Sequence, residues 1–266
     1  MTKTPSLFIS HGAPLLAIED GPAHRFLRSL GDRLKKPKAI IMVSAHHIAR
    51  PISVTLDEKP ETIHDFGGFP KALFDITYGA PGDPMLAERI VGTLNAAGFS
   101  AAGHVQRGFD HGAWVPMFLM YPNADVPMVQ VSIDLQKSPL WHYHFGQALS
   151  VFGEDGMLVI GSGSITHNLH EWMTGHYGHD AASPAWVTRF TEWLAKHLEA
   201  CELSAVLDAV SQAPDGHRNH PTMDHILPLF VALGAGTGQH STAKRLHKST
   251  TYGVLGMDVY RFGDQS

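Results

Sequence analysis

The sequence predicts an α/β fold, a single-domain sandwich in which a mostly central β-sheet is flanked by helices. Short apolar runs typical of buried strands alternate along the chain with longer amphipathic segments typical of helices. Three of the runs, at residues 6–10, 39–44 and 157–160, are each followed within seven residues by a histidine. Because ligands collect beyond the carboxyl ends of the strands in an open α/β sheet, we expect the functional site there.

The other elements follow from local patterns. Gly98 and Gly234 suit the residue after a helix, and Ser183-Pro184 suits a helix start. Residues 60–83 are rich in Gly, Pro and aromatic residues and predict a long loop, typically a lid or binding wall. No repeat or linker divides the chain, so we expect one domain over residues 1–266. The remaining predicted strands are 51–56, 126–133 and 253–262, and the predicted helices are 23–34, 84–97, 140–152, 184–201 and 223–233.

The composition argues against several classes of protein. Hydrophobic residues make up 44% of the chain and charged residues 17%, which indicates a globular protein. The net charge of −5 and the lack of a basic cluster argue against a nucleic-acid partner. No apolar run approaches the ~18 residues that span a bilayer, and the first residues lack signal-peptide features. Cys201 is the only cysteine, which excludes an intrachain disulfide and a thiolate zinc site and fits a cytoplasmic location. The oligomeric state is left open.

Histidine is abundant, with 19 copies against 20 for Lys and Arg together. Neutral imidazole is a common ligand of Zn and Fe. His11 follows the first strand and precedes a Gly-Ala-Pro turn, so it is either a ligand or a turn residue. His46 and His47 point to opposite sides of an extended segment, so only one of them can face the site. His167 follows a Gly/Ser-rich turn that lacks the lysine of a phosphate-binding loop.

Two further candidates lie nearer the carboxyl terminus and in a glycine-flanked loop. His225 is expected in the first turns of the last helix, with His220 as its rival in the preceding loop. His111 follows Asp110, and this is an acid/base pair, an anion-binding loop or a turn in which the aspartate caps the backbone. For His64-Asp65 a simple turn is favoured. The histidines assigned to the surface are His142, His144, His170, His176, His179, His240 and His247.

Other catalytic classes find little support in the sequence. It contains no Gly-x-Ser-x-Gly motif for a nucleophilic hydrolase, and Cys201 falls within a predicted helix. No Gly-x-Gly-x-x-Gly follows the first strand, which argues against a dinucleotide-binding fold. No pair of acids stands out as the two carboxylates of a glycosidase.

Seven short motifs follow one another between residue 6 and about residue 235. They are SHGAP at 10–14, VSAH at 43–46, TIHDFGGFP at 62–70, FDHGAW at 109–114, PMVQVSID at 127–134, GSGSITHNL at 161–169 and PTMDHILPL at 221–229. Each is modest alone. Together they resemble the class III extradiol dioxygenases of the LigB-like superfamily, in particular the small single-chain group similar to 4,5-DOPA extradiol dioxygenase.

The resemblance implies a set of metal ligands. His11, His46 and His225 would bind the ion. His46 takes the ligand position because the family usually has an aromatic residue where His47 stands. His225 matches the position in the last helix, and His220 does not.

The resemblance also implies the chemistry of a single catalytic domain. The chain would open the ring of a catechol, DOPA-like or related, by extradiol cleavage with O2. His167 would be a fourth ligand or the catalytic acid/base, and His111 would contact substrate or O2. Fe(II) is implied for activity, although an all-histidine set also suits Zn(II), which the isolated protein could hold. Asp224 is expected to point away, and the loop 60–83 to exclude water and hold the ring.

Three hypotheses of function follow. The first is a metal-dependent extradiol dioxygenase, the second a zinc-dependent hydrolase, and the third a non-catalytic metal-binding protein on the same scaffold. No group of Arg or Lys marks a carboxylate site, so the particular catechol is left open.

Overall fold

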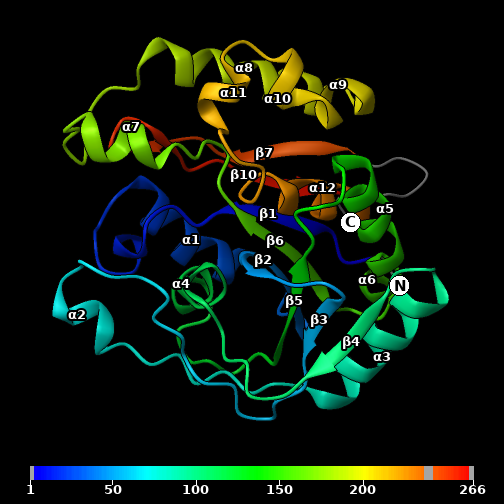
Figure 1. Ribbon diagram of the computed structural model, residues 1–266. Coiled ribbons are helices and arrows are strands. Elements are labelled where there is room, and N and C mark those ends of the chain that lie inside the picture. Colours follow the sequence, from blue (N-terminus) through cyan, green and yellow to red (C-terminus); the bar gives the residue numbers. More distant parts are fainter. Residues whose placement is uncertain (1–2, 237–241, 264–266) are drawn as a thin grey trace.

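The computed structural model describes residues 3–236 and 242–263 and is built around one large sheet with helices on both faces (Figure 1). The sheet has eight strands in the order β4-β3-β5-β2-β6-β1-β10-β7. The predicted α/β fold with a central sheet flanked by helices is confirmed. The strands are β1 (Ser6–Ser10), β2 (Ile40–Ile48), β3 (Ile52–Thr55), β4 (Ala101–His104), β5 (Met128–Ile133), β6 (Leu158–Gly163), β7 (Ala243–His247) and β10 (Val259–Phe262), and β8 (Thr250–Thr251) pairs with β9 (Leu255–Gly256) in a separate small sheet.

The four inner strands, β5, β2, β6 and β1, are mutually parallel. Their carboxyl ends therefore lie at one edge of the sheet, which is the geometry that gathers ligands in this class of fold. The outer strands β3 and β10 each run antiparallel to their inner neighbour. His11 directly follows β1, and His46 lies near the end of β2, so both reach the same edge.

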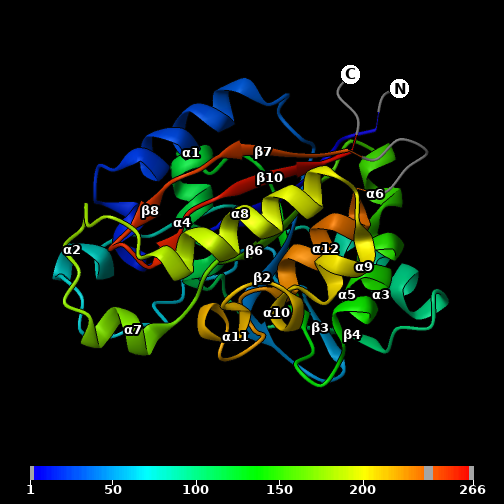
Figure 2. The ribbon, with the colours of Figure 1, turned by 90° about the horizontal axis from the view of Figure 1, so that it is seen from above.

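Side chains alternate between two apolar layers. Phe8 and Ile41 face one layer with α3, α5 and α12, whereas Leu7 and Met42 face the other with α1 and α4. Helix α8 packs against β7 (Figure 2).

None of the helices in the described part of the chain combines the length and apolarity needed to cross a membrane. The helices are η1 (Pro14–Ala17), α1 (Pro22–Arg33), α2 (Lys71–Phe74), α3 (Pro84–Ala96), α4 (His111–Met120), α5 (Pro139–Leu149), α6 (Val151–Glu154), α7 (Leu169–Thr174), α8 (Ala185–Glu199), α9 (Leu203–Leu207), α10 (Ala209–Gln212), α11 (Gly216–Asn219) and α12 (Leu227–Ala235).

Several local predictions were wrong. The loop expected around His111 is the start of α4, a helix that is buried on nearly every side and so shows no amphipathic period. The last helix begins at Leu227, so His225 lies in the turn before it. The single strand predicted over 253–262 is two short strands separated by a break at residues 257–258. Strands β4 and β7 and helices α7, α9, α10 and α11 were not anticipated.

The surface assignment of His142 was also wrong, because this side chain is fully buried. Its Nδ1–H donates to the Ser138 carbonyl at 2.9 Å, and Nε2 accepts the Asp134 N–H at 3.4 Å. Burial lowers the pKa of His142 to about 4, so the ring is neutral and both nitrogens are satisfied. The other histidines assigned to the surface are exposed (His144, His170, His176) or half-buried (His179, His247), and His240 lies outside the described residues.

The Gly/Ser run of β6 is explained by close packing and not by phosphate binding. A Cβ on Gly161 would lie 2.1 Å from the Pro228 carbonyl oxygen, and one on Gly163 would lie 2.1 Å from the His225 carbonyl oxygen. These glycines therefore let α12 and its preceding turn lie directly on the strand. Ser162, between them, points to the opposite face.

Substituting Gly161→Ala should lower the free energy of unfolding by about 2 kcal/mol or more, because the added methyl meets backbone that cannot move aside. Gly92→Ala in α3 is the matched control, since a Cβ there meets nothing within 4 Å. The control should stabilise the helix by up to about 1 kcal/mol. Urea unfolding of both variants measures the difference, and equal stabilities would contradict this account of the packing.

Candidate metal centre

Three imidazoles meet at the carboxyl edge of the parallel strands. His11 Nε2 lies 3.0 Å from His46 Nε2, which in turn lies 3.2 Å from His225 Nε2. The ring centroids are 5.0 Å (His11–His46), 4.9 Å (His46–His225) and 5.3 Å (His11–His225) apart, so the rings form a nearly regular triangle. The structure thus brings together all three residues expected to be ligands.

The outer nitrogen of His11 is held by a buried serine. Ser162 Oγ donates its one proton to the Gly112 carbonyl and therefore accepts from His11 Nδ1–H at 2.9 Å. With Nδ1 protonated, the Nε2 of the neutral ring carries a lone pair directed at the centre. Burial first, and then the neighbouring histidines, hold the pKa of His11 well below its usual range.

His225 is held in the same way by a carboxylate. Its Nδ1–H donates to Asp224 Oδ2, so in the neutral form of the ring Nε2 also carries a lone pair. Asp224 thus contacts the ring nitrogen of His225 that is not directed at His46, a supporting contact that the sequence did not predict. A carboxylate behind a metal-binding histidine fixes the tautomer and the orientation of the ring.

Two lone pairs thus face His46 Nε2, and a single proton on that atom can be shared well with only one of them. Burial, followed by the charges of His111 and His225, lowers the pKa of His46 to about 2, so the ring is neutral. A cation at the centre would satisfy all three nitrogens. Tetrahedral ligands 2.0–2.1 Å from a metal are themselves about 3.3 Å apart, close to the spacing seen here.

Among the described residues, two other sets of three have ligand atoms within 4.8 Å of one another, namely His11, His46 and His111, and His167, Asp224 and His225. In the set of His11, His46 and His225, the Nε2 atom of His46 lies 3.0 and 3.2 Å from the Nε2 atoms of His11 and His225. The ring of His111 lies 4.0 Å from that of His46, beside the centre. We therefore consider His225 the third residue that could hold the ion.

His167 stacks on His225. The two rings are nearly parallel, with centroids 3.4 Å apart and an angle of 9° between their planes. Because a ligand's lone pair lies in its ring plane, an ion in the plane of His225 falls well outside the plane of His167. Burial, followed by the charge of His225, lowers the pKa of His167 to about 3.

The partner of His111 is Asp65, not its neighbour Asp110. Asp65 Oδ1 accepts from both the backbone N–H and the Nδ1–H of His111, each at 2.9 Å. Burial raises the pKa of Asp65, but the hydrogen bonds and charge of His111 outweigh it and lower the pKa to about 2. Asp110 instead caps α4 by accepting from the Ala113 N–H, which is the backbone-capping role among the alternatives left open by the sequence.

Space for the imidazoles depends on Gly112. A Cβ at this position would lie 2.5 Å from Ser44 Oγ, 3.0 Å from His46 Cδ2 and 3.2 Å from His11 Cε1. The first turn of α4 can therefore lie against the two rings only if residue 112 has no side chain.

The long loop contributes an aromatic wall. The ring of Phe66 lies 5.6 Å from that of His111, and Phe69 and Phe74 pack on Phe66 at 5.5 and 5.2 Å. Trp114 Nε1–H donates to the Ile63 carbonyl at 3.0 Å, which fastens the loop to α4. The loop also contains the short helix α2, which the sequence did not predict.

His47 and His220, the two alternatives to His46 and His225, lie in other surroundings. His47 is 2% exposed and lies on the other face of β2 from His46, beside Arg107. His220 is also buried, and its Nε2–H donates to the Ile165 carbonyl at 2.9 Å. His220 is thus a core residue that is hydrogen-bonded through Nε2, whereas its buried Nδ1 has no partner among the described residues.

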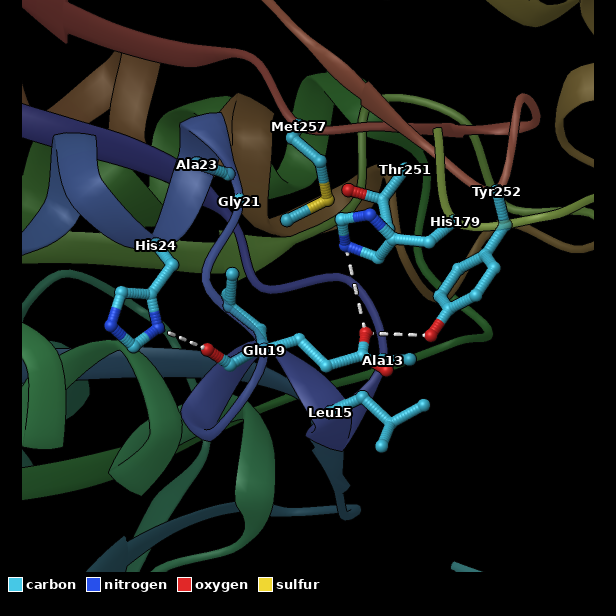
Figure 3. A pocket seen from close by; sticks show the side chains of 11 residues that line it. Ala13, Leu15, Glu19, Gly21, Ala23, His24, His179, Thr251, Tyr252 and Met257 are labelled. Carbon is cyan, nitrogen blue, oxygen red and sulfur yellow. Dashed lines mark hydrogen bonds and ion pairs between the residues drawn. The ribbon is translucent and has the colours of Figure 1, made fainter. Parts of the chain in front are cut away.

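A separate small cavity lies beside the turn that follows His11 (Figure 3). Across the cavity, Glu19 Oε2 accepts a hydrogen bond from the Tyr252 hydroxyl at 2.7 Å, and His179 Nε2 lies 3.7 Å from the same oxygen. Its volume of about 10 Å³ has room for roughly one water molecule. It is too small to hold an aromatic substrate.

The chain is similar in sequence and in overall structure to known proteins. The family model described as the catalytic LigB subunit of aromatic ring-opening dioxygenase matches residues 5–263. The 4,5-DOPA dioxygenase extradiol of Beta vulgaris is 40% identical over 97% of this chain and 96% of that protein, and that of Escherichia coli (strain K12) is 41% identical over 90% and 87%. The crystal structure of an uncharacterized Escherichia coli K12 protein superposes with a TM-score of 0.82 at 32% identity, covering 98% of this chain and all of that one.

Asp224→Asn should weaken Zn(II) binding about 10- to 100-fold, because an amide orients the His225 ring less well than a carboxylate. Asp180→Asn is the matched control. Asp180 is also bonded to the Nδ1 of its neighbouring histidine, His179, at 2.7 Å, but on an exposed surface. Competition with a chromogenic chelator measures both affinities, and an unchanged affinity in Asp224→Asn would contradict the assignment.

The metal-free protein should lose stability as the pH falls from about 7 to about 5. His11, His46 and His167 have pKa values lowered from 6.5, so below that pH the unfolded chain binds protons that the folded chain does not. Each such group lowers the free energy of unfolding by roughly 1.4 kcal/mol per pH unit. Urea titrations at several pH values measure the slope. A His11→Gln/His46→Gln variant should show a shallower slope, and an equal slope would argue against this origin.

Proposed function

The chain belongs to the family of the catalytic LigB subunit of aromatic ring-opening dioxygenases, and on that premise we propose its metal, its substrate and the roles of its residues. It is an extradiol ring-cleaving dioxygenase that requires a metal ion, an aromatic substrate and O2. The similarities do not favour the zinc hydrolase or the non-catalytic binding protein.

The proposed metal is Fe(II), held by His11, His46 and His225. The convergence of their three Nε2 atoms is the observation that carries this proposal. When bound, Fe(II) supplies a Lewis acid that lowers the pKa of a coordinated hydroxyl and a redox centre for O2. Zn(II) fits the same nitrogens but has no redox chemistry, so zinc-filled protein should be inactive.

The proposed substrate is a catechol, DOPA-like or related. The relatives at 40% and 41% identity are named 4,5-DOPA dioxygenases, which supports this class of ring. On the protein side, Phe66 and its aromatic neighbours stand beside His111 and offer an apolar surface against which a ring can lie. The same wall would limit the access of bulk water to the centre.

We assign His167 the role of acid/base catalyst and not that of a fourth ligand. Its ring is stacked face to face on His225, so its nitrogens lie near the centre but its lone pair is not directed at the same ion. His111 would contact the substrate or O2 through Nε2, since its Nδ1–H is given to Asp65. The two histidines thus flank the ligand triangle from different elements, α4 and the turn after β6.

The activity is tested by loading the metal-free protein with Fe(II) under anaerobic conditions and then adding air with DOPA and a panel of other catechols. We expect a yellow semialdehyde product and matching O2 uptake from the iron-loaded protein, and neither from protein loaded with Zn(II). No turnover of any catechol at full iron occupancy would refute the proposed substrate class.

His167→Ala should lower kcat by about 10²- to 10⁴-fold, the usual range for loss of general acid–base catalysis, while iron content is retained. His170→Ala is the control, because His170 lies three residues further along on the exposed side of α7 and should leave kcat unchanged. Iron content by mass spectrometry and O2 uptake are measured on both. Loss of iron in His167→Ala would instead identify His167 as a ligand.

A further inference from the structure

One carboxylate stands between two histidines of the site. Asp65 Oδ1 accepts both the backbone N–H and the Nδ1–H of His111 at 2.9 Å, and Oδ2 lies 3.6 Å from Nδ1 of His46. Asp65 belongs to the long loop, 46 residues before His111. Its side chain is 25% exposed, whereas that of His111 is 8% exposed.

The chain just before Asp65 is fixed by three contacts. Before it, Thr62 forms an isolated parallel bridge with Phe109, and the Ile63 N–H donates to the Phe109 carbonyl at 2.8 Å. The ring of the adjacent His64 is bonded through Nε2 to the Ile76 carbonyl at 3.0 Å. The carboxylate is therefore held in place at the amino-terminal end of α4, where a negative charge is also favoured by the exposed N–H groups of the helix.

An ionised carboxylate can only accept hydrogen bonds. Its bond with His111 therefore requires the proton on Nδ1, and in the neutral form of the ring Nε2 is then left bare. Without this partner the two tautomers of an imidazole are free to exchange, and the ring can turn.

We propose that Asp65 is a positioning residue that fixes the tautomer and orientation of His111, so that its Nε2 acts as a hydrogen-bond acceptor toward the substrate. Phe66 follows Asp65 directly and lies 5.6 Å from the His111 ring, so the same loop segment sets both the histidine and the aromatic wall beside it. Displacement of the loop would release His111. The proposal rests on the role of His111 given above.

The kinetic test uses Asp65→Asn, His111→Gln and the double variant, each loaded with Fe(II) and assayed with DOPA or the catechol that is turned over best. Asp65→Asn keeps an oxygen for the His111 backbone N–H, but its amide can bond to either ring tautomer. We expect kcat to fall about 10- to 100-fold, with KM changed less and iron content retained. The double variant should be no slower than His111→Gln alone, because both changes remove the same function.

Asp75→Asn is the matched control, since Asp75 is an exposed carboxylate of the same loop, paired with Lys71. It should leave kcat unchanged. Two results would overturn the role of Asp65. One is a double variant whose loss of kcat is the product of the losses in the two single variants. The other is a wild-type kcat in Asp65→Asn when His111→Gln is slow. A wild-type kcat in His111→Gln would instead overturn the role proposed for His111.

The tautomer itself can be observed without activity or metal. In protein labelled with 15N-histidine, long-range 1H–15N spectra should show His111 as the Nδ1–H tautomer, its signals assigned by their loss in His111→Gln. Asp65→Asn should abolish this preference and Asp75→Asn should retain it. An Nε2–H tautomer in the wild type, or an unchanged spectrum in Asp65→Asn, would overturn the proposal.

Discussion

The protein depends on holding several imidazoles close together in a buried place where His11 and His46 do not readily take a proton. Burial lowers the pKa of both His11 and His46, and each neighbouring ring adds to the cost of a charge. Lone pairs that approach within 3.2 Å repel one another unless a cation or a proton lies between them. The surrounding structure must therefore hold the rings in place by other bonds, which Ser162 and Asp224 supply from behind.

Much of the fold could be predicted because the four inner strands are short and apolar, and three of them have a histidine at or just beyond their carboxyl ends. The strand alternation also showed that only one of His46 and His47 could face the centre, although the choice required the family resemblance. The helix α4 was missed for a physical reason. All but one of its residues are buried, so it has neither a polar face nor a period to detect. Strand β4, with the sequence Ala-Ala-Gly-His, lacks the branched residues that mark strands.

The supporting carboxylates were harder to predict than the ligands. Asp65 acts on a residue 46 positions away, and no local pattern distinguishes it from an aspartate in an ordinary turn. Asp224 is expected from the sequence to point away from the centre, and this is the direction that a residue supporting His225 from behind must take. What the sequence could not provide was the fold of the long loop, since that loop is placed by bonds to Phe109 and Trp114 and not by its own periodicity.

The alternation along β6 limits how this part of the chain can change during evolution. Gly161 and Gly163 lie under the backbone of α12 and its preceding turn, while Ser162 faces His11 from the reverse side. Deleting or inserting one residue upstream within the strand would exchange the two sides. The side chain of Ser162 would then collide with the backbone of α12 or its preceding turn, and a glycine would face His11 in its place. The strand can thus accept some substitutions but no change of length, whereas loops elsewhere on the surface are free to lengthen.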